Sequence, residues 1–274
     1  MGAFVVVSYW WGNYKRLAER MSKTCIKMNI QSDLVYMKEF ENRNYQLNIN
    51  YKPTFIKKMI LKHKKPVVYL DMDMKIMKYP ELFEYMSYKG VDFGAFNWNA
   101  DMRVFNVYDP FVFETSGGIM YFGNTKNALK LVDLWRLKLN SSKYKKCADD
   151  RVLSMAFDKS NGLKWCKCFW LPFEYIYIPD HFKGVLNMKD VVIMHNSKIT
   201  SEETAAKKGA KDRIPSDYKI ENKVKAQECL YINPVMKKLV HLRPLLKHLK
   251  RKLLYSQCSN KDVYKKLLKV QELM

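Results

Sequence analysis

The sequence predicts an α/β fold in which a mostly parallel central sheet is flanked by helices and followed by a basic helical region. Three observations predict it. Short apolar runs rich in valine, isoleucine and aromatic residues alternate with segments of helical spacing through residues 4–194. The run at residues 67–70 has no polar interruption, as expected of a strand buried on both faces of a parallel sheet. The composition turns basic after residue 206, which divides the chain into a domain at 1–206 and a C-terminal region at 207–274.

The N-terminal third has the order strand, helix, strand, helix, strand. Gly12-Asn13 ends the first strand with a turn, and Pro53 suits the first turn of a helix because it has no amide hydrogen to lose there. Consecutive strands joined by helices predict right-handed crossovers and parallel pairing. We expect strands at residues 4–11, 34–37 and 67–70, helices from the first turn to about residue 30 and from Pro53 onward, and a polar loop at 39–50.

The remainder of the first domain is less regular. A glycine pair opens an apolar run at residues 115–123, and glycines in a strand allow the backbone to approach a ligand or another segment closely. We also expect strands at residues 91–96, 165–170, 175–178 and 191–194, helices at 80–88, from 124 or 125 onward and from 148 onward, and a substrate-facing loop at 97–110.

Two aspartates follow the apolar run at residues 67–70. Alternation along an extended segment predicts that Asp71 and Asp73 point to the same side. Two carboxylates at the carboxyl end of a buried strand offer the hard oxygen ligands that Mg²⁺ and Mn²⁺ prefer, in the crevice where open α/β sheets bind ligands. The alternative is a solvated turn, because an Asp-x-Asp sequence is short and common.

The net charge of +22 predicts anionic partners, which include nucleotides, nucleic acid and acidic membrane surfaces. The region at 207–274 carries 18 lysines and arginines against six acidic residues. Within it, residues 239–254 interleave leucines with basic residues, as in a helix that lies on an anionic membrane, although a solvated appendage or a packing helix fits the same pattern.

The six cysteines are scattered and none has the spacing of a zinc site, so we expect reduced thiols and a cytoplasmic protein. No signal peptide is recognised at the N-terminus, and no apolar stretch approaches the roughly 20 residues of a transmembrane helix. For a virus-encoded protein, this location would be the cytoplasm of the host.

Four features in one order resemble the GT-A glycosyltransferases, which use nucleotide sugars and carry a metal-binding Asp-x-Asp. They are the strand–helix start, the run from Val68 to Asp73, the Ser116-Gly117-Gly118 strand, and Asp149-Asp150 at the start of a helix. The resemblance covers roughly residues 3–198. The richness in tyrosine, lysine and methionine is similar to that of capsid-modifying glycosyltransferases of large DNA viruses.

The resemblance implies a donor site that contains Mn²⁺ or Mg²⁺. Asp73 would bind the metal, and Asp71 would contact the ribose and reach the metal through water. His195 resembles the late histidine that some members add as a metal ligand, although a structural histidine fits equally well. The donor, a UDP- or GDP-linked sugar, is expected to contact Ser8, Tyr9, Trp10, Lys57, Asp71, Met72 and Lys198.

The resemblance also implies a catalytic base. In inverting members an acidic triplet supplies it, and Asp150, or else Asp149, would take the proton of the attacking hydroxyl. Acids in the first turn of a helix also stabilise the helix dipole, which is the structural alternative. Ser116, Gly117 and Gly118 would line the site of a glycan or glycoprotein acceptor.

The expected activity is therefore transfer of a hexose or pentose to a hydroxyl group, with inversion. A nucleic-acid-binding protein or a membrane-peripheral protein without transferase activity is the alternative. Nucleic acid is the less favoured partner, because the sequence has no zinc finger, glycine-rich phosphate loop or basic-aromatic pattern.

Overall fold

The computed structural model describes residues 2–100, 113–115, 117–144, 147–179 and 186–195. Several predictions lie outside these residues: the domain boundary at 206, the basic C-terminal region, most of the loop at 97–110, Ser116 and Lys198.

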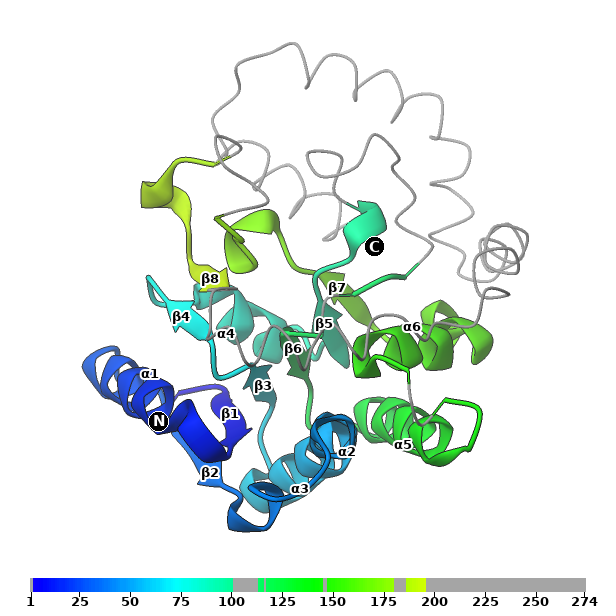
Figure 1. The fold of residues 1–274 in the computed structure, drawn as a ribbon. Helices are drawn as coiled ribbons and strands as arrows, with labels where there is room; N and C mark the ends of the chain where they lie inside the picture. The colour runs from blue at the N-terminus through cyan, green and yellow to red at the C-terminus, as the bar shows by residue number, and fades with distance from the viewer. Residues whose placement is uncertain (1, 101–112, 116, 145–146, 180–185, 196–274) are drawn as a thin grey trace. The chain divides into compact units, whose positions relative to one another are not determined.

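A six-stranded sheet with the strand order β2-β1-β3-β6-β5-β7 forms the centre of the fold (Figure 1). β1 pairs in parallel with both β2 and β3, and β5 pairs in parallel with β7. β6 is antiparallel to β3 and β5, so one strand of the six runs against the others. The predicted mostly parallel sheet is confirmed. The strands are β1 Val5–Trp10, β2 Ser32–Tyr36, β3 Val67–Leu70, β5 Phe93–Ala95, β6 Ile119–Phe122 and β7 Cys168–Trp170.

Helices cover both faces of this sheet, and aromatic contacts show which helix lies on which face. The ring of Tyr69 in β3 packs 6.4 Å from Phe55 of α3, whereas Tyr121 of β6, which pairs with Val68 of β3, stacks 6.2 Å from Phe83 of α4. Side chains of odd and even number point to opposite faces of a strand, so α3 and α4 lie on opposite faces. α5 packs between α3 and α6 (Figure 1). The helices are α1 Lys15–Lys27, α2 Tyr45–Ile49, α3 Lys52–His63, α4 Glu81–Tyr88, α5 Lys126–Asn140, α6 Asp149–Lys159 and α7 Gly162–Trp165.

A second sheet of two antiparallel strands lies beside the first. It pairs β4, Met74–Ile76, with β8, Ile193–His195, and sets Met74 opposite His195. This pairing brings the last described residues of the chain back to the aspartates that follow β3.

Two expectations about secondary structure are wrong. The segment at 39–50 is not simply a loop, because α2 forms within it, capped by the Asn44 side chain that accepts a hydrogen bond from the Gln46 amide. The segment at 175–178 is not a strand: the chain makes a 3₁₀ turn at Phe173–Tyr175, and Tyr177 forms a single bridge to Met194. Both segments are short, so tertiary contacts decide their conformation.

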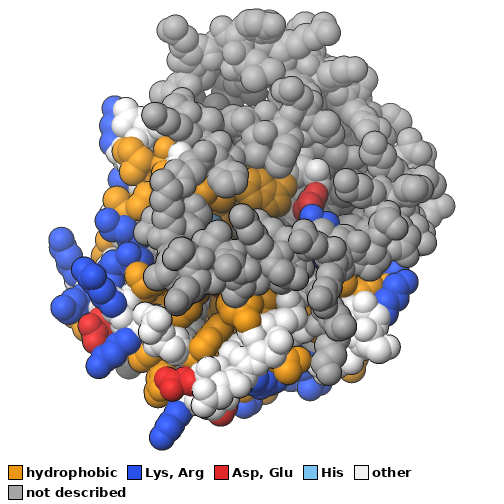
Figure 2. Space-filling model, viewed as in Figure 1, with side chains coloured by type: hydrophobic (Ala, Val, Ile, Leu, Met, Phe, Trp, Pro, Cys, Tyr) orange, Lys and Arg blue, Asp and Glu red, His pale blue; other side chains and the backbone are white. Residues whose placement is uncertain are grey.

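Cys25, Cys147, Cys166 and Cys168 are free thiols, as predicted for the cysteines that the structure describes. Within the same residues, no helix is both long and apolar enough to cross a membrane. Basic side chains gather over the part of the surface formed by α1 (Figure 2), where Lys15, Arg16, Lys23 and Lys27 are exposed. Part of the positive charge therefore lies on the first domain.

Candidate active site

The two aspartates after β3 lie in a turn. β3 ends at Leu70, and the amide of Met74 donates a 2.9 Å hydrogen bond to the carbonyl of Asp71. The Asp71 amide donates to the Gly118 carbonyl at 2.8 Å, which fixes the start of the turn against β6. The expectation of two carboxylates on one side of an extended segment is therefore corrected: in a tight turn the alternation is lost, and the two side chains meet different partners.

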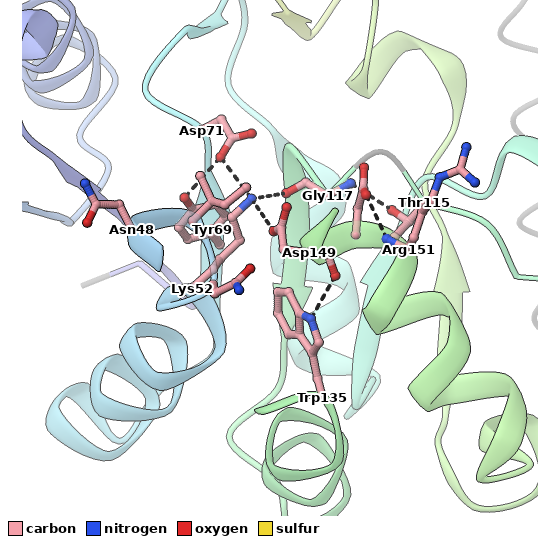
Figure 3. Close-up of polar contacts among 12 residues, drawn as sticks. Asn48, Lys52, Tyr69, Asp71, Thr115, Gly117, Trp135, Asp149 and Arg151 are labelled. Atoms are coloured by element: carbon pink, nitrogen blue, oxygen red, sulfur yellow. Dashed lines mark hydrogen bonds and ion pairs between the residues drawn. The ribbon is translucent and has the colours of Figure 1, made fainter. Parts of the chain in front are cut away.

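Asp71 meets a buried lysine from the first turn of α3. The Lys52 ammonium lies 3.3 Å from Asp71 Oδ1 and 2.8 Å from Asp149 Oδ2, and it donates to the Gly117 carbonyl at 3.2 Å (Figure 3). It also lies 5.0 Å from the centre of the Tyr69 ring, whose hydroxyl donates to Asp71. A single cation thus joins the end of β3 to the start of α6.

Burial alone would make this lysine unfavourable, because Lys52 is only 4% exposed. Burial lowers the pKa of its ammonium, but the charges of Asp149 and Asp71 outweigh burial and hold the pKa well above the ordinary value. Lys52 is therefore charged in the folded protein.

Asp73 meets the histidine of the second sheet. Its carboxylate is buried, and Oδ2 lies 3.0 Å from Nε2 of His195. Arg20 of α1 donates to the Met74 carbonyl at 3.3 Å and so supports the end of the same turn. Although 122 residues separate them in the sequence, Asp73 and His195 are held together by the pairing of β4 with β8.

This pair fits a divalent cation. Two adjacent ligands of an octahedral ion at about 2.1 Å are separated by about 3.0 Å, which is the separation of these two atoms. The described residues contain no group of three or more histidine, cysteine, aspartate or glutamate side chains arranged around one point. A carboxylate and an imidazole would leave most coordination positions to water and phosphate, which is how Mg²⁺ is commonly held at phosphate sites. The same distance also suits a direct hydrogen bond.

Asp149 and Asp150 begin α6 but have different surroundings. Asp149 is buried, its carboxylate pairs with Lys52, and its carbonyl accepts a 2.8 Å hydrogen bond from the Trp135 indole (Figure 3). Asp150 is half-buried, and its carboxylate accepts a hydrogen bond from the Arg151 amide at 2.7 Å. Burial, and then the negative charge of Asp149, raise the pKa of Asp150 to about 7.

The glycine pair that precedes β6 lies between the two acidic groups. Gly117 has a φ of 64°, and a Cβ atom there would lie 2.7 Å from the Cβ of Asp150. A Cβ at Gly118 would lie 2.5 Å from the Met74 side chain and 3.4 Å from Asp71 Oδ2. The pair therefore allows the backbone to approach both ends of the site, as its position at the start of the strand predicts.

The aromatic residues at the end of β1 divide between two faces. Tyr9 is buried and donates to the Asn48 carbonyl at 2.8 Å, and the buried Ser8 hydroxyl donates to the Leu70 carbonyl at 2.6 Å. Trp10 packs 4.6 Å from Tyr36 on the face opposite to Tyr9. Ser8 and Tyr9, which are expected to lie beside the nucleotide, thus use their hydroxyls for hydrogen bonds within the protein.

Tyr45 was not predicted as a site residue, whereas Trp11 lies at the end of the first strand, where the nucleobase is expected. Trp11 is half-buried and stacks 5.9 Å from the Tyr9 ring, with Tyr45 of α2 at 6.0 Å on another side. Burial, and then the charge of Asp71, raise the pKa of Tyr45, which places its hydroxyl within the field of the site carboxylates.

Lys57 and Met72, which are both expected to contact the donor, have different surroundings in the structure. Lys57 pairs with Asp133 of α5 at 2.7 Å, so the lysine that reaches the carboxylates is Lys52 from the same helix. Met72 lies buried in the turn after β3. A signal for Lys52 exists in the sequence: it precedes Phe55 by three residues and therefore continues the apolar stripe of its helix, where a lysine must be paired.

No protein-family model and no curated protein matches this chain. Among solved structures, the chain is similar to a crystal structure described as a glycosyltransferase involved in the glycosylation of the major capsid of PBCV-1. The TM-score is 0.55 and the sequence identity is 12%, over 77% of this chain and 100% of that chain. The predicted GT-A-like arrangement is thus confirmed at the level of the fold, and this chain shares its fold with a viral glycosyltransferase.

Proposed function

We propose that this protein is a metal-dependent glycosyltransferase that moves a sugar from a nucleoside-diphosphate sugar to a hydroxyl group of a glycan or glycoprotein. One observation carries the proposal. On a fold shared with a glycosyltransferase, Asp71 after β3 and Asp149 at the start of α6 meet at a single buried lysine, and Asp73 and Asp150 are close to them in the sequence.

Asp73 and His195 would hold Mn²⁺ or Mg²⁺ at the donor end of the site. When bound, the ion would neutralise the diphosphate and stabilise it as the leaving group. The charges support a need for such an ion: Asp71 and Asp73 follow β3, Asp149 and Asp150 begin α6, and Lys52 contacts only two of these four carboxylates, so an anionic diphosphate would otherwise be repelled.

The nucleoside of a UDP- or GDP-linked donor would lie at the carboxyl end of β1. Of the three aromatic residues there, Tyr9 is buried and Trp10 lies on the opposite face of the sheet, whereas Trp11 is half-buried beside Tyr9. We therefore assign Trp11, with Tyr45, to the nucleotide side of the site. Asp71 would contact the ribose, as the resemblance to the GT-A enzymes implies.

Asp150 would act as the base. As the acceptor oxygen bonds to the anomeric carbon and the bond to the diphosphate breaks, the hydroxyl proton passes to the Asp150 carboxylate. A base that acts opposite the leaving group gives inversion. The raised pKa of about 7 suits a group that must bind a proton during turnover.

The acceptor is proposed by analogy of fold. The similar PBCV-1 protein is described as taking part in glycosylation of a capsid protein, and we propose a glycoprotein or its glycan as the acceptor here. The two glycines before β6 bring the backbone close to Asp150, on the side of the site where we propose that the acceptor binds.

Calorimetric titration of the wild-type protein with a panel of nucleotide sugars and free nucleotides, in Mn²⁺ and in EDTA, tests the proposal. We expect one nucleoside diphosphate class to bind in Mn²⁺, with binding lost in EDTA and in Asp73→Ala. Asp133→Ala is the matched control, because Asp133 pairs with Lys57 on the surface between α3 and α5.

The absence of binding by every nucleotide would contradict the transferase proposal. Retention on random DNA that weakens with salt, in a protein that binds no nucleotide sugar, would instead favour the nucleic-acid-binding alternative. Binding to anionic vesicles without nucleotide-sugar binding would favour a membrane-peripheral protein.

A further inference from the structure

Lys52 stands at the junction of the two halves of the site. It comes from the first turn of α3, yet its ammonium contacts the carboxylate after β3, the carboxylate that begins α6, and the Gly117 carbonyl before β6. Three segments that are far apart in the sequence therefore converge on one buried cation (Figure 3).

The contacts of Lys52 distinguish the two acids of α6. Asp149 is fixed twice, by the ammonium at 2.8 Å and through its carbonyl by the Trp135 indole. Asp150 has no ion-pair partner within the described residues and accepts a hydrogen bond from its neighbouring amide. A carboxylate held by a buried lysine is poorly placed to take a proton, whereas its neighbour keeps that freedom.

We propose that Lys52 is a positioning residue that holds Asp71 for the donor and Asp149 as a fixed anion, so that Asp150 alone acts as the base. This inference rests on the proposed transferase function. Lys52 does not need to touch the reacting atoms: it acts through the two carboxylates that it joins.

The burial of Lys52 makes its role hard to replace. Without its charge, the buried Asp149 and the partly exposed Asp71 would lie near each other without a cation between them, and one or both would move or bind a proton. Loss of Lys52 should therefore affect donor binding and turnover together. Loss of Asp150 should affect turnover alone.

The experiment compares Lys52→Met, Lys52→Arg, Asp149→Asn and Asp150→Asn, once calorimetry has identified a donor that binds the wild-type protein. Hydrolysis of that donor serves as the readout, because water replaces the unknown acceptor. Lys62→Met is the matched control: Lys62 lies on the same helix and pairs with Asp33 at 2.7 Å, at an exposed position.

We expect Asp150→Asn to lower kcat by about 10²- to 10⁴-fold with little change in the donor KM, as for loss of a general base. Asp149→Asn should lower kcat less. Lys52→Met should raise the donor KM and lower kcat, and Lys52→Arg should restore much of both, because the charge returns. The double change Lys52→Met with Asp149→Asn should be more stable than Lys52→Met alone, since it removes an uncompensated anion.

Wild-type kinetics in Lys52→Met, or a larger loss of kcat in Asp149→Asn than in Asp150→Asn, would overturn the inference while the transferase proposal stands. A wild-type protein that binds no nucleotide sugar would remove the transferase proposal and this inference with it. If Lys52→Met does not fold, Lys52→Arg and the double variant, Lys52→Met with Asp149→Asn, are compared with the wild type instead. The inference would also be overturned if Lys52→Arg folds but is inactive and the double variant is no more stable than Lys52→Met.

Discussion

Gly117 determines how closely Asp150 can approach the backbone segment just before β6. Its φ of 64° disfavours any side chain, and a Cβ would meet Asp150 at 2.7 Å. Gly90 has a φ of 62° with nothing within 4 Å of the same added atom. Alanine at either position has the same unfavourable backbone conformation, but only alanine at Gly117 would also collide with the site. Comparison of the two variants therefore separates the backbone effect from the steric effect.

We predict that Gly117→Ala lowers turnover by about 10-fold or more because Asp150 is displaced from its productive position. Gly90→Ala should have only the backbone cost, about 1 kcal/mol in the free energy of unfolding, with full turnover. Donor hydrolysis and urea unfolding of both variants measure this. Equal turnover in the two variants would show that Asp150 does not depend on Gly117.

The pKa of Asp150 gives a pH dependence with a definite sign. A base must be ionised, so we predict that kcat rises with pH and levels off above the apparent pKa of about 7. The same carboxyl binds more protons in the folded than in the unfolded state between about pH 4 and pH 7, so stability falls as pH rises through that window.

Asp150→Asn should therefore increase thermal stability relative to wild type at pH 8, and the difference should shrink towards pH 4. Thermal unfolding at the two pH values measures it. A variant that is less stable than wild type at pH 8 would contradict a raised pKa for Asp150.

At the scale of elements, α2 links the N-terminal strands to the start of α6. The Gln46 amide group donates a 2.8 Å hydrogen bond to the Cys147 carbonyl, two residues before Asp149. Tyr45 of the same helix packs 6.0 Å from Trp11, and burial, followed by the charge of Asp71, raises its pKa. A segment that looks like a polar loop in the sequence thus helps to hold the two halves of the site together.

We predict that Gln46→Leu lowers the free energy of unfolding by about 1 kcal/mol, because a carbonyl loses its partner. Gln31→Leu is the control, since Gln31 is exposed and accepts a hydrogen bond from Lys65 at 3.3 Å. Urea unfolding compares them, and hydrogen exchange at the first turn of α6 should be faster in Gln46→Leu alone. Unchanged exchange there would show that α2 does not hold α6.

At the scale of the whole molecule, the charge is divided between the first domain and the C-terminal region. The exposed basic residues of α1 lie on the domain, and 18 basic residues lie at 207–274. The site itself gathers carboxylates. A basic protein with an acidic site would attract anionic surfaces generally and bind a nucleotide through a divalent ion at one place.

We predict that the C-terminal region binds anionic membranes. Changing Lys247, Lys250 and Arg251 together to glutamate should lower co-sedimentation with phosphatidylserine vesicles by about 10-fold or more, since each charge near the surface contributes about 1 kcal/mol. Nucleotide-sugar binding should be unchanged, because no site residue is altered. Equal co-sedimentation of the variant and the wild type would contradict a membrane role for these residues.

Sequence patterns alone predicted the alternation of strands and helices at the start of the chain, the buried strand that ends just before Asp71, and the helix that begins with Asp149 and Asp150. These follow from local patterns: uninterrupted apolar residues, glycine and proline signals, and acids in a first helical turn. The resemblance to the GT-A enzymes names Asp73 and His195 separately as metal ligands, and the structure places Oδ2 of Asp73 3.0 Å from Nε2 of His195.

The contacts between side chains of the site depend on tertiary packing. The apolar stripe of α3 includes Lys52, but its carboxylate partners are fixed only when α3 packs on the sheet, and Lys57 meets Asp133 only because α5 packs beside α3. The turn at Asp71 and the helix at α2 depend on hydrogen bonds to Gly118 and Cys147, which are 47 and 101 residues away. Hydrophobic periodicity shows which face of a helix or strand is apolar. It does not show which side chain of another element will contact that face, because this depends on packing between segments distant in the sequence.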